Sequence, residues 1–270
     1  MILLAGALVV AVSAQAPPAT GPLPSDRSEA YFHFSLGLQA RLAGDSDEAL
    51  AEYRRAQKLD PASSSIRVET ARLLREMGKL DESAEEARAA GSLDAEDADA
   101  RLVLAQLEQI QASGPAAEEA LERAAVQYEE VVRLRPTDGQ SLLNLAGIYG
   151  QLRKHTEAAR AWGLYLALDP GNFEAHVQRG THLLMAGQSD EAADALKTAL
   201  ELQPGSARAY QILGDIYAGA EQADQAILHY RKALEVEPGN VRIRLALGEV
   251  LLQAKRPQEA LAEAEAVRAA

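Results

Sequence analysis

The chain has 270 residues, of which 47% are hydrophobic and 4% aromatic, and its formal net charge at pH 7 is -13. This acidity argues against a surface for nucleic acid or for anionic membranes, because both ligands require clustered Lys and Arg. Cysteine is absent, which excludes disulfides, thiolate catalysis and thiolate zinc sites.

The N-terminal segment is apolar and carries no charged side chain before Asp26. An apolar run that ends in small residues is typical of a bacterial secretory signal peptide, and this one is too short to span a bilayer comfortably. Val12-Ser13-Ala14 fits a cleavage site that leaves Gln15 as the first residue. An alternative is a disordered or wrongly assigned N-terminus, since no Lys or Arg precedes the run.

We therefore predict a signal peptide at residues 1–14 and a Pro-rich linker at residues 15–29. Pro17, Pro18, Pro22 and Pro24 favour an extended spacer. The mature chain is expected to have no stable membrane span, and to be periplasmic or secreted.

Between residues 136 and 238 a proline returns every 34 residues, at Pro136, Pro170, Pro204 and Pro238. A fixed period of this length indicates one supersecondary unit that stacks on its own copies. Helical sequence precedes and follows each proline, and proline cannot continue a helix. Each unit is therefore predicted to be a pair of helices, with the breaks falling between the units.

Seven such units are predicted within residues 30–270, namely 30–63, 64–97, 98–138, 139–172, 173–206, 207–240 and 241–270. The third unit has 41 residues, seven more than the period. Seven residues are about two helical turns, so the apolar phase nearly survives the insertion. We expect a lengthened second helix that starts near Pro115.

Small residues recur at the eighth position of every unit: Gly37, Ala71, Ala105, Ala146, Gly180, Gly214 and Gly248. A second set recurs in the second helix: Ala49, Ser83, Ala124, Ala158, Ala192, Ala226 and Ala260. Both sets predict that the two helices of a unit approach each other closely.

The unit from Ala207 to Asn240 combines these features with Tyr210, Leu213, Tyr217, Tyr230 and Pro238. On these residues the chain resembles a tetratricopeptide repeat protein over nearly its whole length after residue 29. The resemblance implies an all-α fold, a right-handed α-solenoid of about seven helix-turn-helix repeats. Arg67 and Arg101 depart from it, because they stand where an aromatic residue is expected near the start of the first helix.

Acidic pairs recur near the start of second helices, at Asp47-Glu48, Asp81-Glu82 and Asp190-Glu191. Adjacent residues on a helix do not converge on one atom, whereas acids at a helix N-terminus interact favourably with its dipole. His33, His155, His176 and His182 are expected to be ordinary packing or surface residues. Phosphate-binding loops, nucleophile elbows and HExxH helices are missing, so no catalytic, cofactor or metal site is predicted.

The resemblance also implies a concave groove, lined by the first helices, that holds an extended peptide or a partner helix. The fifth residues of the units form a nearly continuous apolar line: Phe34, Val68, Leu102, Leu143, Val177, Gln211 and Leu245. Asn144 and Gln178 stand beside this line and could hold a peptide backbone through their side-chain amides. The alternative is that these side chains pack between neighbouring first helices.

These features predict a non-catalytic scaffold that binds a peptide or a partner protein. An alternative is the recognition arm of a larger enzyme, or of a secretion or envelope-assembly complex, whose catalytic part is elsewhere. The carboxylate-binding signature of co-chaperones is not present in any three consecutive units. At the C-terminal end, Leu261, Ala264 and Val267 lack an obvious neighbour. This end is expected to associate with a second molecule or to continue in a longer chain.

Overall fold

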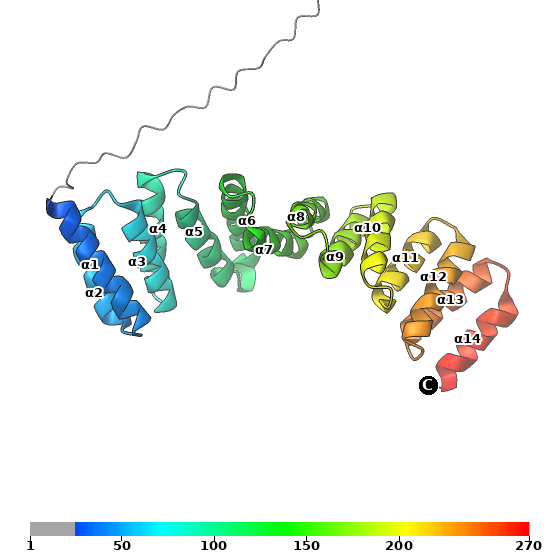
Figure 1. Ribbon diagram of the computed structural model, residues 1–270. Coiled ribbons are helices and arrows are strands. Elements are labelled where there is room, and N and C mark those ends of the chain that lie inside the picture. Colours follow the sequence, from blue (N-terminus) through cyan, green and yellow to red (C-terminus); the bar gives the residue numbers. More distant parts are fainter. Residues whose placement is uncertain (1–24, 270) are drawn as a thin grey trace, which may run out of the picture. The chain divides into compact units, whose positions relative to one another are not determined.

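A computed structural model describes residues 25–269, and the regular elements within that range are all helices (Figure 1). The predicted signal peptide and the predicted linker up to residue 24 lie outside the described residues. The chain divides into two compact units, one ending at Ala62 and the other starting at Ser63. Each unit is described by itself below.

The first unit contains one helix pair, α1 (Ser25–Leu42) and α2 (Ser46–Leu59). Helix α1 starts within the residues predicted as linker, and Asp26 in its first turn favours the helix dipole. Gly44 takes a φ of +85° in the turn, and the Asp45 side chain accepts a hydrogen bond from the backbone N–H of Glu48 (3.0 Å) to cap α2. Tyr53 of α2 packs on Gly37 of α1.

The second unit contains six helix pairs: α3 (Ser64–Glu76) and α4 (Leu80–Leu93), α5 (Ala98–Gln111) and α6 (Ala117–Leu134), α7 (Gly139–Gln151) and α8 (His155–Leu168), α9 (Phe173–Met185) and α10 (Ser189–Leu202), α11 (Ala207–Gly219) and α12 (Ala223–Val236), α13 (Val241–Gln253) and α14 (Pro257–Ala269). Each helix packs against the next one in the chain, as Figure 1 shows. This arrangement confirms the prediction of an all-α solenoid.

Each first helix of the second unit begins after a side-chain cap. The capping residues are Ser63, Asp97, Asp138, Asn172, Ser206 and Asn240, and the side chain of each accepts a hydrogen bond from a backbone N–H in the first turn. A cap satisfies N–H groups that have no partner inside the helix. Two features therefore form the break between pairs: the end of one second helix, and the capping residue that starts the next first helix shortly afterwards.

The extra residues of the third predicted repeat lengthen its second helix. Helix α6 has 18 residues, whereas α4, α8, α10 and α12 have 14. A short 3-10 helix, Gly114–Ala116, precedes α6 and contains Pro115 near its start. The prediction of a longer helix starting near Pro115 is confirmed.

Close approach within a pair depends on a small residue that faces a large one. A Cβ atom added at Gly214 would lie 2.5 Å from Cε1 of Tyr230, and one at Gly180 would lie 2.9 Å from Cγ of Leu196. At Gly248 no neighbouring atom lies within 4 Å of the added Cβ. The residue of α14 that corresponds to Tyr230 is Ala264, which explains this space.

The structure explains the two arginines that depart from the repeat pattern. Arg67 donates to the Glu86 carboxylate (2.8 Å), and Arg101 donates to Oε1 of Gln127 (3.3 Å). Both contacts join the fourth residue of a repeat, on its first helix, to one corresponding position on the second helix of the same repeat. We call this contact the inter-helix pair. Its other members include His33 with Glu52, Tyr210 with His229, and Arg244 with Glu263.

The pair of Tyr210 with His229 predicts a pH-dependent stability. The His229 ring is stacked near Tyr210 and Tyr217, at centroid distances of 6.1 and 5.3 Å. Burial lowers the pKa of His229, and the charges of Lys232 and Lys197 lower it further. The native state therefore binds a proton on this ring less readily than the unfolded chain does.

Because the pKa of His229 is lower in the folded state than in the unfolded state, the protonation of His229 costs no stability above the unfolded pKa of about 6.5. It destabilises the fold as the pH falls from there through the folded pKa. We expect the loss of melting temperature between pH 7.5 and pH 5.5 to be smaller in His229→Gln than in the wild type. Thermal melts at both pH values measure this difference, and equal losses in the two proteins would contradict it.

The last helix, α14, exposes Leu261 at a position that is buried in other repeats. The corresponding residues Ala84, Ala125, Ala159, Ala193 and Ile227 are all buried. Leu261 in α14 is 60% exposed, Ala264 is exposed and Val267 is half-buried. The expected association of this end with a second molecule stays a prediction.

Candidate functional site

The predicted apolar line divides into buried and accessible residues. Val68 is 3% exposed and Val177 is fully buried, so both belong to the core and cannot contact a ligand. They lie on α3 and α9, and these first helices contact the next first helices, α5 and α11, directly. For these two valines the groove prediction is wrong, and the alternative of packing between first helices is correct.

The other members of the line are at least partly accessible. In the first unit, Phe34 is half-buried and its ring lies 5.5 Å from that of Tyr53. In the second unit, Leu102, Leu143 and Gln211 are half-buried, and Leu245 is 52% exposed. Of the two predicted amides, Gln178 donates to the Glu174 carboxylate of its own helix (2.6 Å). Asn144 belongs to a larger network.

A hollow on the second unit brings together residues from four helices. It is lined by Arg75 of α3, by Gln106, Gln109 and Ile110 of α5, by Tyr128 of α6 and by Asn144 of α7. Only Asn144 was predicted from the sequence. Arg75 and Gln109 stand at the twelfth position of two successive repeats, and Gln106 stands at the ninth position of its repeat. Long polar side chains at the same position of successive repeats are the sequence signal that could have found these residues.

Hydrogen bonds fix the direction of the amides in this hollow. Gln140 donates to Oδ1 of Asn144 (3.2 Å), and Nδ2 of Asn144 donates to the Tyr128 hydroxyl (3.0 Å). That hydroxyl donates to Oε1 of Gln109 (3.0 Å). Burial raises the pKa of Tyr128, so the phenol keeps its proton and acts as a donor at neutral pH. The amide oxygens of Asn144 and Gln109 are thus both occupied.

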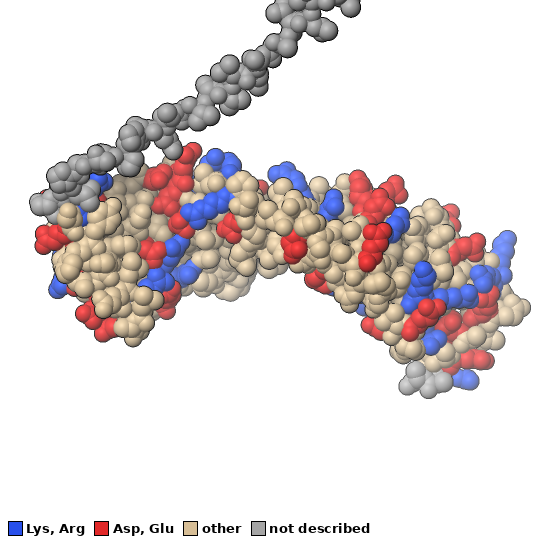
Figure 2. All heavy atoms as spheres, viewed as in Figure 1, with Lys and Arg blue, Asp and Glu red and all other residues tan. Residues whose placement is uncertain are grey.

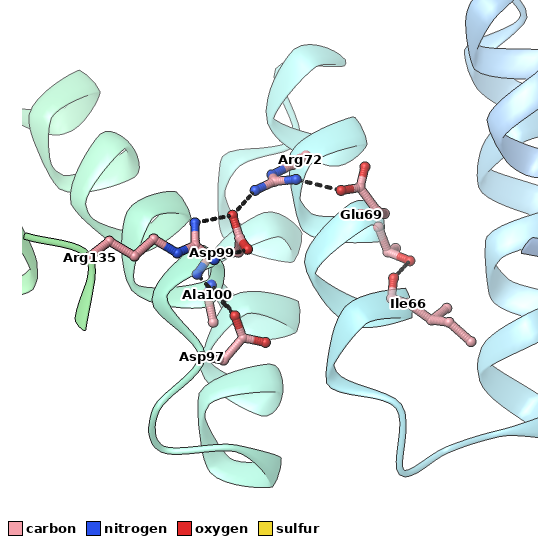
Figure 3. Close-up of polar contacts among 8 residues, drawn as sticks. Ile66, Glu69, Arg72, Asp97, Asp99, Ala100 and Arg135 are labelled. Carbon is pink, nitrogen blue, oxygen red and sulfur yellow. Dashed lines mark hydrogen bonds and ion pairs between the residues drawn. The ribbon is translucent and has the colours of Figure 1, made fainter. Parts of the chain in front are cut away.

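Charged residues of α3 and α5 form a cluster of ion pairs with Arg135, as Figure 3 shows. Arg72 donates to Glu69 (2.5 Å) and to Asp99, and Arg135 donates to Asp99 from the other side (3.1 Å for the Nη1 contact). The hydrogen bond from Arg135 is the main cause that lowers the pKa of Asp99. This cluster joins α3, the start of α5 and the residue that follows α6.

Arg75 differs from these arginines, since it makes no ion pair within residues 25–269. Its guanidinium carries five N–H donors and remains charged at any physiological pH. Together with Nε2 of Gln109, it makes the hollow rich in donors. A peptide carbonyl or a carboxylate is the kind of group that such a surface binds.

The acidic pairs of the sequence occupy helix N-termini in the described part of the chain, in the first turns of α2, α4 and α10. No group of three or more His, Asp or Glu side chains that could hold a metal ion occurs in residues 25–269. None of the helices described is long and apolar enough to cross a membrane. On the face drawn in Figure 2, basic and acidic side chains are interspersed.

Comparison with known families identifies the repeat. One sequence model of the tetratricopeptide repeat matches residues 24–64, 111–173 and 177–235, and a second matches residues 217–270. These ranges leave out residues 65–110, which contain Arg67 and Arg101. No curated protein matches the chain.

Several solved structures share the fold. YrrB, described as a tetratricopeptide repeat protein with an unusual peptide-binding site, is 22% identical, with 76% of this chain and 97% of that chain covered and a TM-score of 0.56. A tetratricopeptide repeat protein from Parabacteroides merdae is 16% identical, with coverages of 90% and 93% and a TM-score of 0.52. A chain in the structure of Naa15/Naa10 bound to HypK-THB is 17% identical, with coverages of 89% and 36% and a TM-score of 0.73.

Proposed function

Because this chain belongs to the tetratricopeptide repeat family, we propose that it is a non-catalytic scaffold that binds a peptide or a partner protein along the first helices of residues 63–269. The observation that carries this proposal is the donor-rich hollow on α3, α5, α6 and α7. YrrB, which shares the fold, is described as having a peptide-binding site.

The hollow suits the backbone of an extended peptide. The bonds from Gln140 and Tyr128 occupy the amide oxygens of Asn144 and Gln109. A ligand therefore meets N–H donors, and peptide carbonyl groups are the acceptors that every peptide carries. Ile110, which is 54% exposed, adds an apolar contact at the edge of the hollow. Apolar contacts surrounded by polar groups are common in protein interfaces.

Selection of peptides from a random display library against the full chain tests this proposal. We expect the selected peptides to bind about tenfold more weakly to Arg75→Gln and to Gln109→Ala, a loss of about 1.4 kcal/mol each. Arg123→Gln is a matched control, because Arg123 is an exposed arginine of α6 that does not line the hollow. Peptides that bind all four proteins equally would contradict the proposed site.

A further inference from the structure

A second hollow lies between α4, α5 and α6 and has a volume of about 390 Å³. Sites for small molecules typically have volumes of about 300–1,000 Å³. The lining of the second hollow includes Arg88 and Gly91 of α4, Arg101, Leu104 and Glu108 of α5, and Gln127 of α6. None of these residues lines the donor-rich hollow, which uses Gln106, Gln109 and Ile110 of α5. The two hollows therefore lie on different faces of α5.

Gly91 gives the second hollow its space. The corresponding residues of the next four repeats are larger, namely Val132, Leu166, Leu200 and Leu234. Those side chains are buried or pack against the core. A Cβ atom added at Gly91 would have no neighbouring atom within 4 Å. Space that an aliphatic side chain occupies in the later repeats is therefore open here, and Leu104 provides an apolar contact beside it.

Arg101 lacks the carboxylate partner that other arginines at its repeat position have. The other two arginines of the inter-helix pairs each donate to a carboxylate, in the pairs Arg67–Glu86 and Arg244–Glu263. Arg101 donates instead to the neutral amide of Gln127 (3.3 Å), and it makes no ion pair within residues 25–269. Its side chain is half-buried. A charge that is partly removed from water is stabilised by an opposite charge, which Arg101 does not have in this chain.

The other groups of the second hollow leave its positive charge in place. Arg88 makes neither an ion pair nor a side-chain hydrogen bond in the described part of the chain. Glu108 is neutralised, because Arg123 donates to its carboxylate (2.9 Å). Gln127 accepts the bond from Arg101 through Oε1, so its Nε2 remains a donor for a ligand. Two guanidinium groups and one amide therefore make this hollow suitable for an anion.

We propose that the second hollow binds a small organic dicarboxylate. One carboxylate of this ligand takes the place that Glu86 holds opposite Arg67, and it bonds to Arg101. Guanidinium and carboxylate groups match each other in geometry and form two parallel hydrogen bonds. The other carboxylate bonds to Arg88, and the short carbon chain between them lies against Leu104. This site goes beyond the proposed scaffold function, because its ligand is a small molecule.

Titration calorimetry of the full chain with succinate, at constant ionic strength, tests this proposal. We expect one succinate per chain, with the affinity reduced about tenfold or more in Arg101→Gln because a charged hydrogen-bond donor is lost. Arg179→Gln is the matched control, since Arg179 is a half-buried arginine of α9 that makes no ion pair within residues 25–269. Arg179 does not line the second hollow, so this variant should bind succinate as the wild type does.

Propionate and inorganic phosphate test the class of the ligand. Propionate has only one carboxylate, so it should bind the wild type more weakly than succinate does. Arg88→Gln should reduce the affinity for succinate to the level of propionate. Equal binding of propionate and succinate by the wild type would overturn the assignment of a dicarboxylate, and so would tighter binding of phosphate than of succinate.

Gln127→Glu gives a second variant, which keeps both arginines. It supplies the carboxylate that the other arginine pairs contain, and this carboxylate competes with the ligand for Arg101. We expect the affinity for succinate to fall about tenfold or more and the melting temperature to rise. If Arg101→Gln fails to fold, Gln127→Glu still decides. Unchanged affinity for succinate in Gln127→Glu would overturn the proposal, as would the absence of succinate binding by the wild type.

Discussion

Gly214→Ala is expected to lower the free energy of unfolding by about 1–3 kcal/mol, although alanine is the better helix former. The added methyl group would lie 2.5 Å from Cε1 of Tyr230. That ring cannot easily move away, because Tyr230 is 2% exposed and its hydroxyl donates to Oδ1 of Asp215 (2.7 Å). The strain therefore outweighs the gain in helix propensity.

Gly248→Ala provides the matched control, because Gly248 occupies the same repeat position on α13 and has no neighbouring atom within 4 Å of the added Cβ. This substitution is expected to raise the free energy of unfolding by about 0.5–1 kcal/mol. Urea unfolding of the two variants beside the wild type measures both effects. If Gly214→Ala is as stable as Gly248→Ala, the close approach of α11 and α12 does not depend on glycine.

Glu86→Lys is expected to lower the free energy of unfolding by about 2 kcal/mol, because it places two positive charges at one inter-helix pair. Both Arg67 and Glu86 have side chains that are 25% exposed, so water screens the repulsion only in part. The double variant Arg67→Glu with Glu86→Lys restores opposite charges. It should recover most of the loss.

Glu130→Lys is the matched control for this charge reversal. Glu130 pairs with Arg133 on the same helix, and these side chains are 38% and 56% exposed. Exposed pairs contribute about 0–1 kcal/mol, so the control should change stability little. Thermal and urea unfolding of the wild type, Arg67→Glu, Glu86→Lys and the double variant form a double-mutant cycle. A double variant no more stable than Glu86→Lys would show that the pair makes no specific contribution.

The helix pairs could be predicted from the sequence because the signals that define them are local. A proline or a capping residue acts on the adjacent turn, and the seven additional residues near Pro115 extend α6 without changing which face is apolar. The resemblance to the tetratricopeptide repeat family predicts the order in which the helices follow each other. None of these inferences required knowledge of which side chains meet across the fold.

The site could be predicted only in part, because its contacts join distant residues. Val68 and Leu143 have the same repeat position and similar chemistry, yet only Val68 is covered by the next first helix. In the sequence Arg67 only departs from the repeat pattern, because its partner Glu86 is 19 residues away. The network around Asn144 uses Tyr128 of the preceding repeat, and its direction follows from hydrogen bonds that the sequence does not contain.

The inter-helix pairs also constrain how such a chain can change by recombination. An exchange that joined α3 to α10 would place Arg67 opposite Ala195, which offers no acceptor for the guanidinium. An exchange of α3 together with α4 would carry Glu86 along with Arg67 and keep their bond. Crossovers between repeats are therefore compatible with folding, whereas crossovers in the turn inside a repeat separate matched partners. The whole helix pair is therefore the segment that recombination can exchange without separating paired side chains.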